Sequence, residues 1–144
     1  MCGIVGYIGQ KNSAVDFVVG GLKALEYRGY DSAGIAAADE GRLIYLKNAG
    51  RVNSLAKLVA ENGHSYQQVD SGISCGIGHT RWATHGRPTK INAHPHTDTS
   101  KKIFVVCNGI VENYQELKAD LQEKGYKFAS ETDTEVIPHL IDYY

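Results

Sequence analysis

The sequence predicts a single domain of the α+β class. Short apolar runs that end at glycine or polar turns predict strands, and segments with apolar residues at helical spacing predict helices between them. The length of 144 residues is close to that of one average domain. Hydrophobic residues make up 42% of the chain and only three residues are proline, which is typical of a folded core and excludes a disordered or collagen-like chain.

In the first half of the chain, three strand-like and two helix-like patterns can be justified in order. Ser13 precedes an amphipathic run and is expected to act as a helix N-cap. Asp39-Glu40-Gly41 is typical of a hairpin turn, and Gly63 suits the left-handed residue after a helix. The expected elements are a strand at 3–8, a helix from Ser13 to about residue 25, a hairpin of strands 33–38 and 42–47, and a helix at 54–62.

In the second half, a small-residue strand is expected at 73–78 and a buried strand at 103–107. Between them, residues 79–100 hold four of the six histidines and little periodicity, which predicts a long loop, and loops of that length in compact domains are usually functional or disordered. Two capping pairs predict two further helices: Asn113 with Glu116, stopped by Gly125, and Thr132 with Glu135. Pro138 lies inside the last helix, which must therefore start late or kink, and the absence of an end signal at Tyr144 predicts that the chain is cut within an element.

Composition and cysteine usage narrow the class of function. The formal net charge is -1, which argues against a nucleic-acid binder, and no signal peptide or membrane-length apolar run is evident. The three cysteines, Cys2, Cys75 and Cys107, lie too far apart in the sequence for a metal knuckle and are odd in number. We therefore expect a protein of the reducing cytoplasm that binds neither membranes nor nucleic acid.

The most specific local feature is Cys2, directly after the initiator methionine. Removal of Met1 would give an N-terminal cysteine whose α-amine has a reference pKa of about 7.7 to 8.0, so that one residue supplies both a nucleophile and a base. The alternative is that a cysteine at position 2 is an inert thiol.

An acyl-transfer site also needs hydrogen-bond donors for the developing oxyanion. Asn108-Gly109 follows an apolar run and can supply an amide side chain and an accessible backbone N–H. Asn-Gly is also a strong signal for a hairpin turn, and both interpretations stay open.

The segment 79–86 clusters groups that suit an amino-acid ligand. Arg81 offers a fork for an α-carboxylate, Trp82 can close over a site, and Asp133 can pair with an α-ammonium. Taken singly, each could be a solvated loop residue or a helix cap. Four histidines at 79, 85, 94 and 96 suggest zinc, but cysteine and carboxylate ligands are missing at standard spacing, and phosphate-binding glycine loops are absent, so we expect no metal and no cofactor.

Together these residues resemble the class II glutamine amidotransferases, and within them the glutamine:fructose-6-phosphate aminotransferase family. The segments that carry the resemblance span the chain: Met1-Cys2-Gly3-Ile4-Val5-Gly6, Glu26-Tyr27-Arg28-Gly29-Tyr30-Asp31-Ser32-Ala33-Gly34, His79-Thr80-Arg81-Trp82-Ala83-Thr84-His85-Gly86, Asn92-Ala93-His94-Pro95-His96, Asn108-Gly109 and Ser130-Glu131-Thr132-Asp133-Thr134-Glu135.

The resemblance implies an αββα sandwich of the N-terminal-nucleophile hydrolase type and hydrolysis of the glutamine side-chain amide. It assigns Cys2 as the nucleophile and Asn108 with Gly109 as the oxyanion hole. It places the glutamine carboxylate on Arg81, Thr84 and His85, the ammonium on Asp133, and the closing tryptophan at Trp82. Arg28 would support the N-terminus, and Cys107 stands where family members often have histidine.

The resemblance also implies that residues 1–144 are the N-terminal portion of a glutaminase domain, with the sandwich incomplete and the sugar-isomerase domain absent. In the intact enzyme, which would be a homodimer, the ammonia would convert fructose-6-phosphate to glucosamine-6-phosphate. Two alternatives remain at this point: a non-catalytic fragment or binding module, and the glutaminase part of another class II amidotransferase.

Overall fold

The computed structural model describes residues 1–9, 13–39, 41–62, 67–68, 74–83 and 87–144. In chain order its elements are β1 (Gly3–Gly9), α1 (Ala14–Ala24), η1 (Glu26–Arg28), β2 (Ser32–Asp39), β3 (Arg42–Ala49), α2 (Val52–Glu61), β4 (Gln67–Gln68), β5 (Ser74–Arg81), β6 (His96–Thr97), β7 (Phe104–Val105), α3 (Tyr114–Glu123), η2 (Asp133–Glu135) and α4 (Val136–Tyr143).

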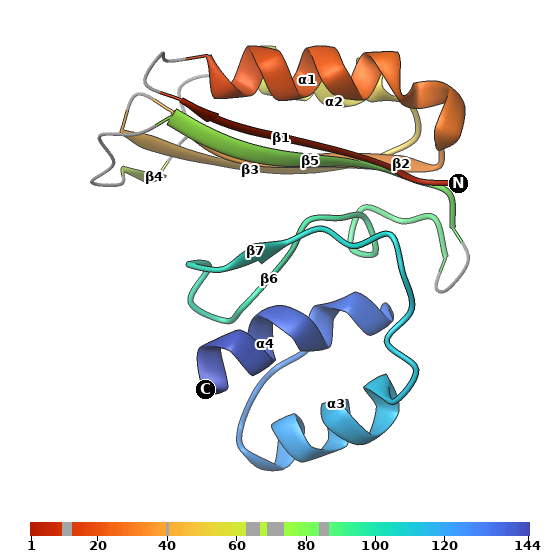
Figure 1. Ribbon diagram of the computed structural model, residues 1–144, viewed down its shortest axis with the longest axis vertical. Coiled ribbons are helices and arrows are strands. Elements are labelled where there is room, and N and C mark those ends of the chain that lie inside the picture. Colours follow the sequence, from red (N-terminus) through yellow and green to blue (C-terminus); the bar gives the residue numbers. More distant parts are fainter. Residues whose placement is uncertain (10–12, 40, 63–66, 69–73, 84–86) are drawn as a thin grey trace.

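These elements form four layers (Figure 1). Helices α1 and α2 cover one face of a five-stranded sheet, the short β6–β7 pair lies on its other face, and α3 and α4 lie beyond that pair. The α+β class and the αββα sandwich are thus confirmed. None of the helices in the described residues is long and apolar enough to cross a membrane.

The large sheet is antiparallel throughout, in the order β1-β5-β2-β3-β4. Strand β5 pairs with β1 and β2 along its length, so Gly3 lies opposite Thr80 and Ser32 lies opposite Arg81. This register brings the start of β1 and the end of β5 to the same end of the sheet. Cys2 and Trp82, the residues that adjoin these strand ends, therefore become neighbours.

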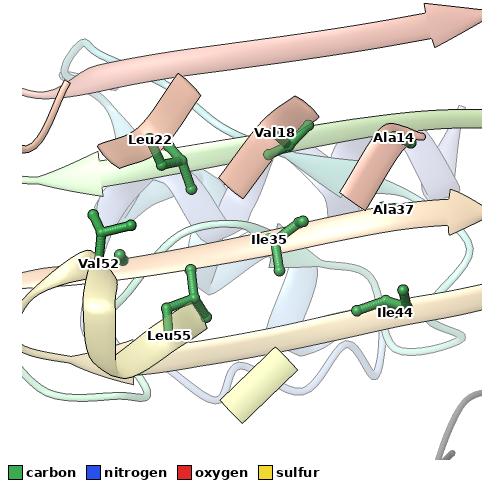
Figure 2. Close-up of a cluster of buried hydrophobic side chains, with 9 residues drawn as sticks. Ala14, Val18, Leu22, Ile35, Ala37, Ile44, Val52 and Leu55 are labelled. Atoms are coloured by element: carbon green, nitrogen blue, oxygen red, sulfur yellow. The ribbon is translucent and has the colours of Figure 1, made fainter. Parts of the chain in front are cut away.

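The hydrophobic core fills the space between the two helices and the sheet (Figure 2). Its apolar side chains come from positions at helical spacing in α1 and α2 and from alternating positions in β2, as the patterns of the sequence require. The fully buried members are Ala14, Val18 and Leu22 of α1, Val52 and Leu55 of α2, and Ile35 of β2. Glu26 Oε2 accepts a 2.7 Å hydrogen bond from Val52 N and so caps α2 from η1.

On the opposite face of the sheet, backbone packs directly on backbone. A Cβ added to Gly34 of β2 would lie 2.1 Å from the carbonyl oxygen of His94. Only glycine permits this approach, which seats the segment before β6 on the middle of the large sheet. β6 then pairs with β7, with His96 opposite Val105.

The expected elements of the first half are confirmed, with boundaries shifted by at most two residues. Ser13 occupies the N-cap position of α1, but its hydroxyl donates to Tyr7 Oη at 3.0 Å and makes no capping hydrogen bond. The expected turn residue Glu40 and the expected helix-stop residue Gly63 lie outside the described residues.

The expected extents of one loop and one strand in the second half are wrong. The loop at 79–100 begins three residues later, because β5 continues to Arg81 with hydrogen-bonded partners on both sides. The buried strand at 103–107 is reduced to Phe104–Val105 and is only half-buried, since within the described residues β6 alone pairs with it.

Both helices expected in the second half are present, but only some of the interactions expected at their ends are observed. Neither Asn113 nor Thr132 makes a side-chain capping bond, so both capping pairs are wrong. Gly125, at φ 92°, does end α3, with hydrogen bonds from Gly125 N to Gln122 O and from Tyr126 N to Leu121 O that form a Schellman motif.

Pro138 causes no break in the last helix. A 3₁₀ turn over Asp133–Glu135 comes first, and α4 begins at Val136. Pro138 therefore lies in the first turn of α4, where a backbone N–H has no partner within the helix. Of the two options that the sequence left open, the later start is the one observed.

Candidate active site

A cavity of about 380 Å³ lies at the end of the large sheet where β1 begins and β5 ends. The segments after β7 and around η2 complete its wall from the other layers. It is lined by Met1, Cys2, Arg28, His79, Arg81, Trp82, His94, Cys107, Asn108, Gly109, Ile110, Thr132, Asp133 and Thr134. The structure thus brings together seven of the nine site residues predicted from the sequence. The other two, Thr84 and His85, lie outside the described residues.

Cys2 is half-buried at the mouth of this cavity and is held through both its side chain and its backbone. Its Sγ accepts a hydrogen bond from Trp82 N at 3.2 Å. Its carbonyl oxygen accepts from Asn108 Nδ2 at 3.2 Å and from Arg28 Nε at 3.4 Å. Met1 is 79% exposed, so the residue whose removal would free the Cys2 amine is open to solvent.

Asn108 and Gly109 follow β7 and lead through a short turn toward α3, so they do not form the turn of a hairpin. The carboxamide of Asn108 points Nδ2 at Cys2 and Oδ1 at His79, whose Nε2 is 2.7 Å away. A Cβ at Gly109 would lie 3.3 Å from Cys107 Sγ, so the wall is already close-packed there.

Two buried groups of opposite charge line the same cavity. Arg81, the last residue of β5, is 4% exposed and donates to Arg87 O at 3.2 Å. Burial lowers the pKa of its guanidinium, against the opposing effect of the nearby carboxylates of Asp31 and Asp133. Asp133, the first residue of η2, is 6% exposed and accepts a 2.7 Å hydrogen bond from Val111 N.

Trp82 is 45% exposed beside the cavity and packs edge-on against Tyr30, with ring centroids 5.5 Å apart. The next residue, Ala83, donates its N–H to Asp31 Oδ2 at 2.8 Å. The Tyr-Arg-Gly-Tyr-Asp segment therefore braces the backbone that carries Trp82. In the sequence this segment only supported the family resemblance, and no role could be assigned to Tyr30 or Asp31.

Sequence reasoning also missed a column of three buried histidines, two of which, His79 and His94, line the cavity. The rings of His79 and His94 stack at 4.3 Å, and His94 meets His96 edge-on at 4.6 Å. Burial lowers the pKa of His79 to about 4 and that of His96 to about 3, and it lowers the pKa of His94 still further, so all three are neutral at pH 7. Alternation along a strand that included residue 79 would have placed His79 beside Arg81.

In the described part of the chain, no three His, Cys, Asp or Glu side chains are grouped as the ligands of a metal ion. The site consists instead of a thiol, amide and backbone donors beside it, and a cation and a carboxylate in the same lining. A thiol with donors aimed at an oxyanion is suited to acyl transfer. A cation and a carboxylate in the same cavity are suited to the two charges of an amino acid.

Comparison with known proteins agrees with this chemistry. The family described as "Glutamine amidotransferase domain" matches residues 44–144. The glutamine--fructose-6-phosphate aminotransferases [isomerizing] of Clostridium perfringens and Pyrococcus horikoshii are each 55% identical to this chain, over 100% and 99% of it. The chain spans 22% of the length of each of these relatives.

Two solved structures share the fold over 98% of this chain and 29% of their own. One is titled as the allosteric regulatory enzyme of purine biosynthesis, with a TM-score of 0.74 and 31% identity. The other is the glutamine phosphoribosylpyrophosphate amidotransferase from B. subtilis, with a TM-score of 0.70 and 29% identity. On the strength of the family match and of relatives more than half identical along its whole length, this chain belongs to the glutamine amidotransferase domain family of enzymes.

Proposed function

We propose that this chain hydrolyses the side-chain amide of glutamine to glutamate and ammonia, with Cys2 as the nucleophile. The observation that carries the proposal is the position of Cys2. Its Sγ lies 3.2 Å from Trp82 N and its carbonyl lies 3.2 Å from Asn108 Nδ2, in a cavity that is also lined by Arg81 and Asp133.

The proposed reaction begins with the loss of Met1, which turns the peptide nitrogen of Cys2 into a free amine. This amine takes the thiol proton, directly or through a water, and the sulfur attacks the amide carbon of glutamine. Asn108 Nδ2–H and Gly109 N–H stabilise the resulting oxyanion. The C–N bond then breaks, the protonated amine gives its proton to the departing nitrogen, and ammonia leaves a γ-glutamyl thioester. Water, deprotonated by the same amine, hydrolyses the thioester and restores the thiol.

The rest of the cavity would hold the amino-acid end of the substrate. Arg81 pairs with the α-carboxylate and Asp133 with the α-ammonium, since each is buried and its charge is opposite to that of its partner. We also propose Thr84 and His85 as contacts of the carboxylate, and Trp82 as the residue that closes over bound glutamine. Arg28 would hold the backbone of Cys2 in place through its 3.4 Å contact.

The test compares two cysteine variants. Cys2→Ala removes the nucleophile and is expected to abolish glutamine hydrolysis, measured as glutamate formed. Cys75→Ala is the matched control, because Cys75 lies on β5 outside the cavity lining, and it is expected to keep at least half of the wild-type rate. Hydrolysis that persists in Cys2→Ala would contradict the proposal, as would equal loss in both variants.

For the longer protein, we propose that residues 1–144 are the N-terminal portion of its glutaminase domain. The names of the relatives support fructose-6-phosphate as the acceptor of the ammonia, at a sugar-isomerase domain outside these residues. We further propose a homodimer of the cytoplasm that needs no cofactor or metal for glutamine hydrolysis. In the longer protein, Cys2→Ala should stop glutamine-dependent formation of glucosamine-6-phosphate; unchanged formation would refute the role of this domain.

A further inference from the structure

His79 is a buried side chain that makes direct contact with the proposed oxyanion hole. It lies on β5 two residues before Arg81 and has no exposed surface. Its Nε2 is 2.7 Å from Asn108 Oδ1. The reaction as proposed above gives it no role, since His79 is neither the nucleophile nor one of the two charged groups that would hold the amino acid.

The direction of this hydrogen bond follows from its surroundings. Asn108 donates through Nδ2 to the Cys2 carbonyl, which can only accept, so its other terminal atom, Oδ1, faces His79. An amide oxygen also only accepts, so the proton must lie on His79 Nε2. The opposite tautomer would bury an N–H at Nδ1, for which the described residues offer no hydrogen-bond partner.

The imidazole is held more firmly than the amide that it contacts. Backbone pairing fixes His79 on both sides, with Ile4 of β1 and Gly34 of β2 directly opposite. Its ring stacks on His94 at 4.3 Å with 17° between the planes, and His94 Nδ1 in turn accepts from Cys107 N at 3.4 Å. Asn108, in contrast, is an exposed residue outside any strand or helix.

We propose that His79 is a positioning residue that fixes the carboxamide of Asn108, so that Nδ2–H and not Oδ1 faces the reacting carbonyl. This inference rests on the proposed function, in which Asn108 is an oxyanion donor. An exposed amide that is free to rotate would present its oxygen part of the time, and that oxygen repels an oxyanion. A donor fixed before the reaction needs no reorganisation in the transition state, where one such donor is worth about 10²- to 10³-fold in kcat.

The kinetic test uses the full-length protein and two substitutions at one position. His79→Leu removes the donor and keeps an apolar side chain of related size, and we expect kcat for glutamine hydrolysis to fall by about ten- to a hundredfold, part of the value of one oxyanion donor. KM should change less than about threefold, because ground-state binding does not use the oxyanion hole. His79→Gln, whose amide N–H can replace Nε2–H, should recover most of kcat.

A double-substitution cycle shows whether His79 acts through Asn108. In an Asn108→Ala background, His79→Leu should lower kcat no further, since there is no amide left to orient. Rate losses that multiply would overturn the inference, and so would a raised KM with unchanged kcat. A neutron structure of each single variant gives a readout that does not depend on turnover, because it distinguishes the amide nitrogen of Asn108 from its oxygen. Asn108 should have one carboxamide orientation in the wild type and in His79→Gln, and an altered or mixed one in His79→Leu.

The two proposals can fail separately. An active wild-type enzyme whose Asn108 keeps its orientation in His79→Leu would overturn the inference about His79 alone. A folded wild-type enzyme without glutamine hydrolysis would contradict the proposed function, and with it the catalytic value of this contact.

Discussion

Asp133 is a buried carboxylate whose position depends on a single turn. The 3₁₀ start of the last helix places it in the cavity wall, and the N–H of Val111 holds one of its oxygens at 2.7 Å. Because the same cavity contains the guanidinium of Arg81, the two ends of an amino acid can be distinguished by charge alone.

Asp133→Asn should raise KM for glutamine with little change in kcat. The amide keeps an oxygen for Val111 N and loses the charge that pairs with the substrate ammonium. A hydrogen bond to a charged group contributes about 1.5 to 3 kcal/mol, so KM should rise roughly ten- to a hundredfold. Steady-state hydrolysis measures both constants. Asp16→Asn, an exposed change in the first turn of α1, is the control and should leave both constants unaltered.

At the scale of single residues, sequence reasoning found side chains whose chemistry is rare and missed those whose role is to support them. Cys2, Arg81 and Asn108 carry groups that an amidase needs, and they could be identified without coordinates. His79 could not, because the predicted strand ended at residue 78 and residue 79 was assigned to the loop that follows. Its role depends on β1 and β2, whose pairing with residue 79 cannot be read from the sequence around that residue.

At the scale of elements, the position of the segment before β6 depends on the close approach of its backbone to β2. Its His94 carbonyl lies over Gly34 of β2, at a place where even a methyl group would overlap it at 2.1 Å. The stacked rings of His79 and His94, and through them the wall of the cavity, rely on this contact.

Gly34→Ala should therefore destabilise the protein, by about 1 to 3 kcal/mol if the segment can move aside, as overpacked sites usually do. Gly20→Ala provides the opposite case. Gly20 lies within α1, and an added Cβ meets nothing within 4 Å, so alanine should stabilise the helix by about 0.5 to 1 kcal/mol. Denaturant unfolding of both variants checks the pair; a neutral or stabilising Gly34→Ala would show that the contact is not tight.

Most elements could be placed from periodicity and turn residues, since these are local properties of the chain. The length of β5 and the shortness of β7 could not, because both depend on how many partner strands lie alongside. Helix caps failed for a related reason. Glu135, expected to complete a capping pair, instead accepts from Ala129 N and Ser130 N, whose approach depends on the fold of the preceding loop.

Across the whole molecule, neutral histidines lie between the large sheet and the β6–β7 layer. Burial is the largest cause of their low pKa values, and the positive charges of Arg81 and Lys47 add to it. In the unfolded chain their pKa returns to about 6.5. Between about pH 6.5 and pH 4, the unfolded state therefore binds protons that the folded state does not.

Stability should fall as the pH is lowered through this window. Each histidine contributes about 1.4 kcal/mol per pH unit to the loss, until the pH reaches its folded-state pKa. The free energy of unfolding in denaturant, measured at pH 7 and at pH 5, should be lower at pH 5. Equal values would show that the histidines are protonated in the folded protein and that the column is not buried as described.

The central claim is that Cys2, once its amine is free, forms the bond to the side-chain amide carbon of glutamine. Three cysteines are present, and two of them, Cys2 and Cys107, line the cavity. Reaction with an electrophilic glutamine analogue, followed by peptide mass spectrometry, reads out both the site of attachment and the state of the N-terminus. The account predicts one adduct per chain, on Cys2 of molecules that have lost Met1. An adduct on Cys107, or equal labelling of molecules that retain Met1, would contradict it.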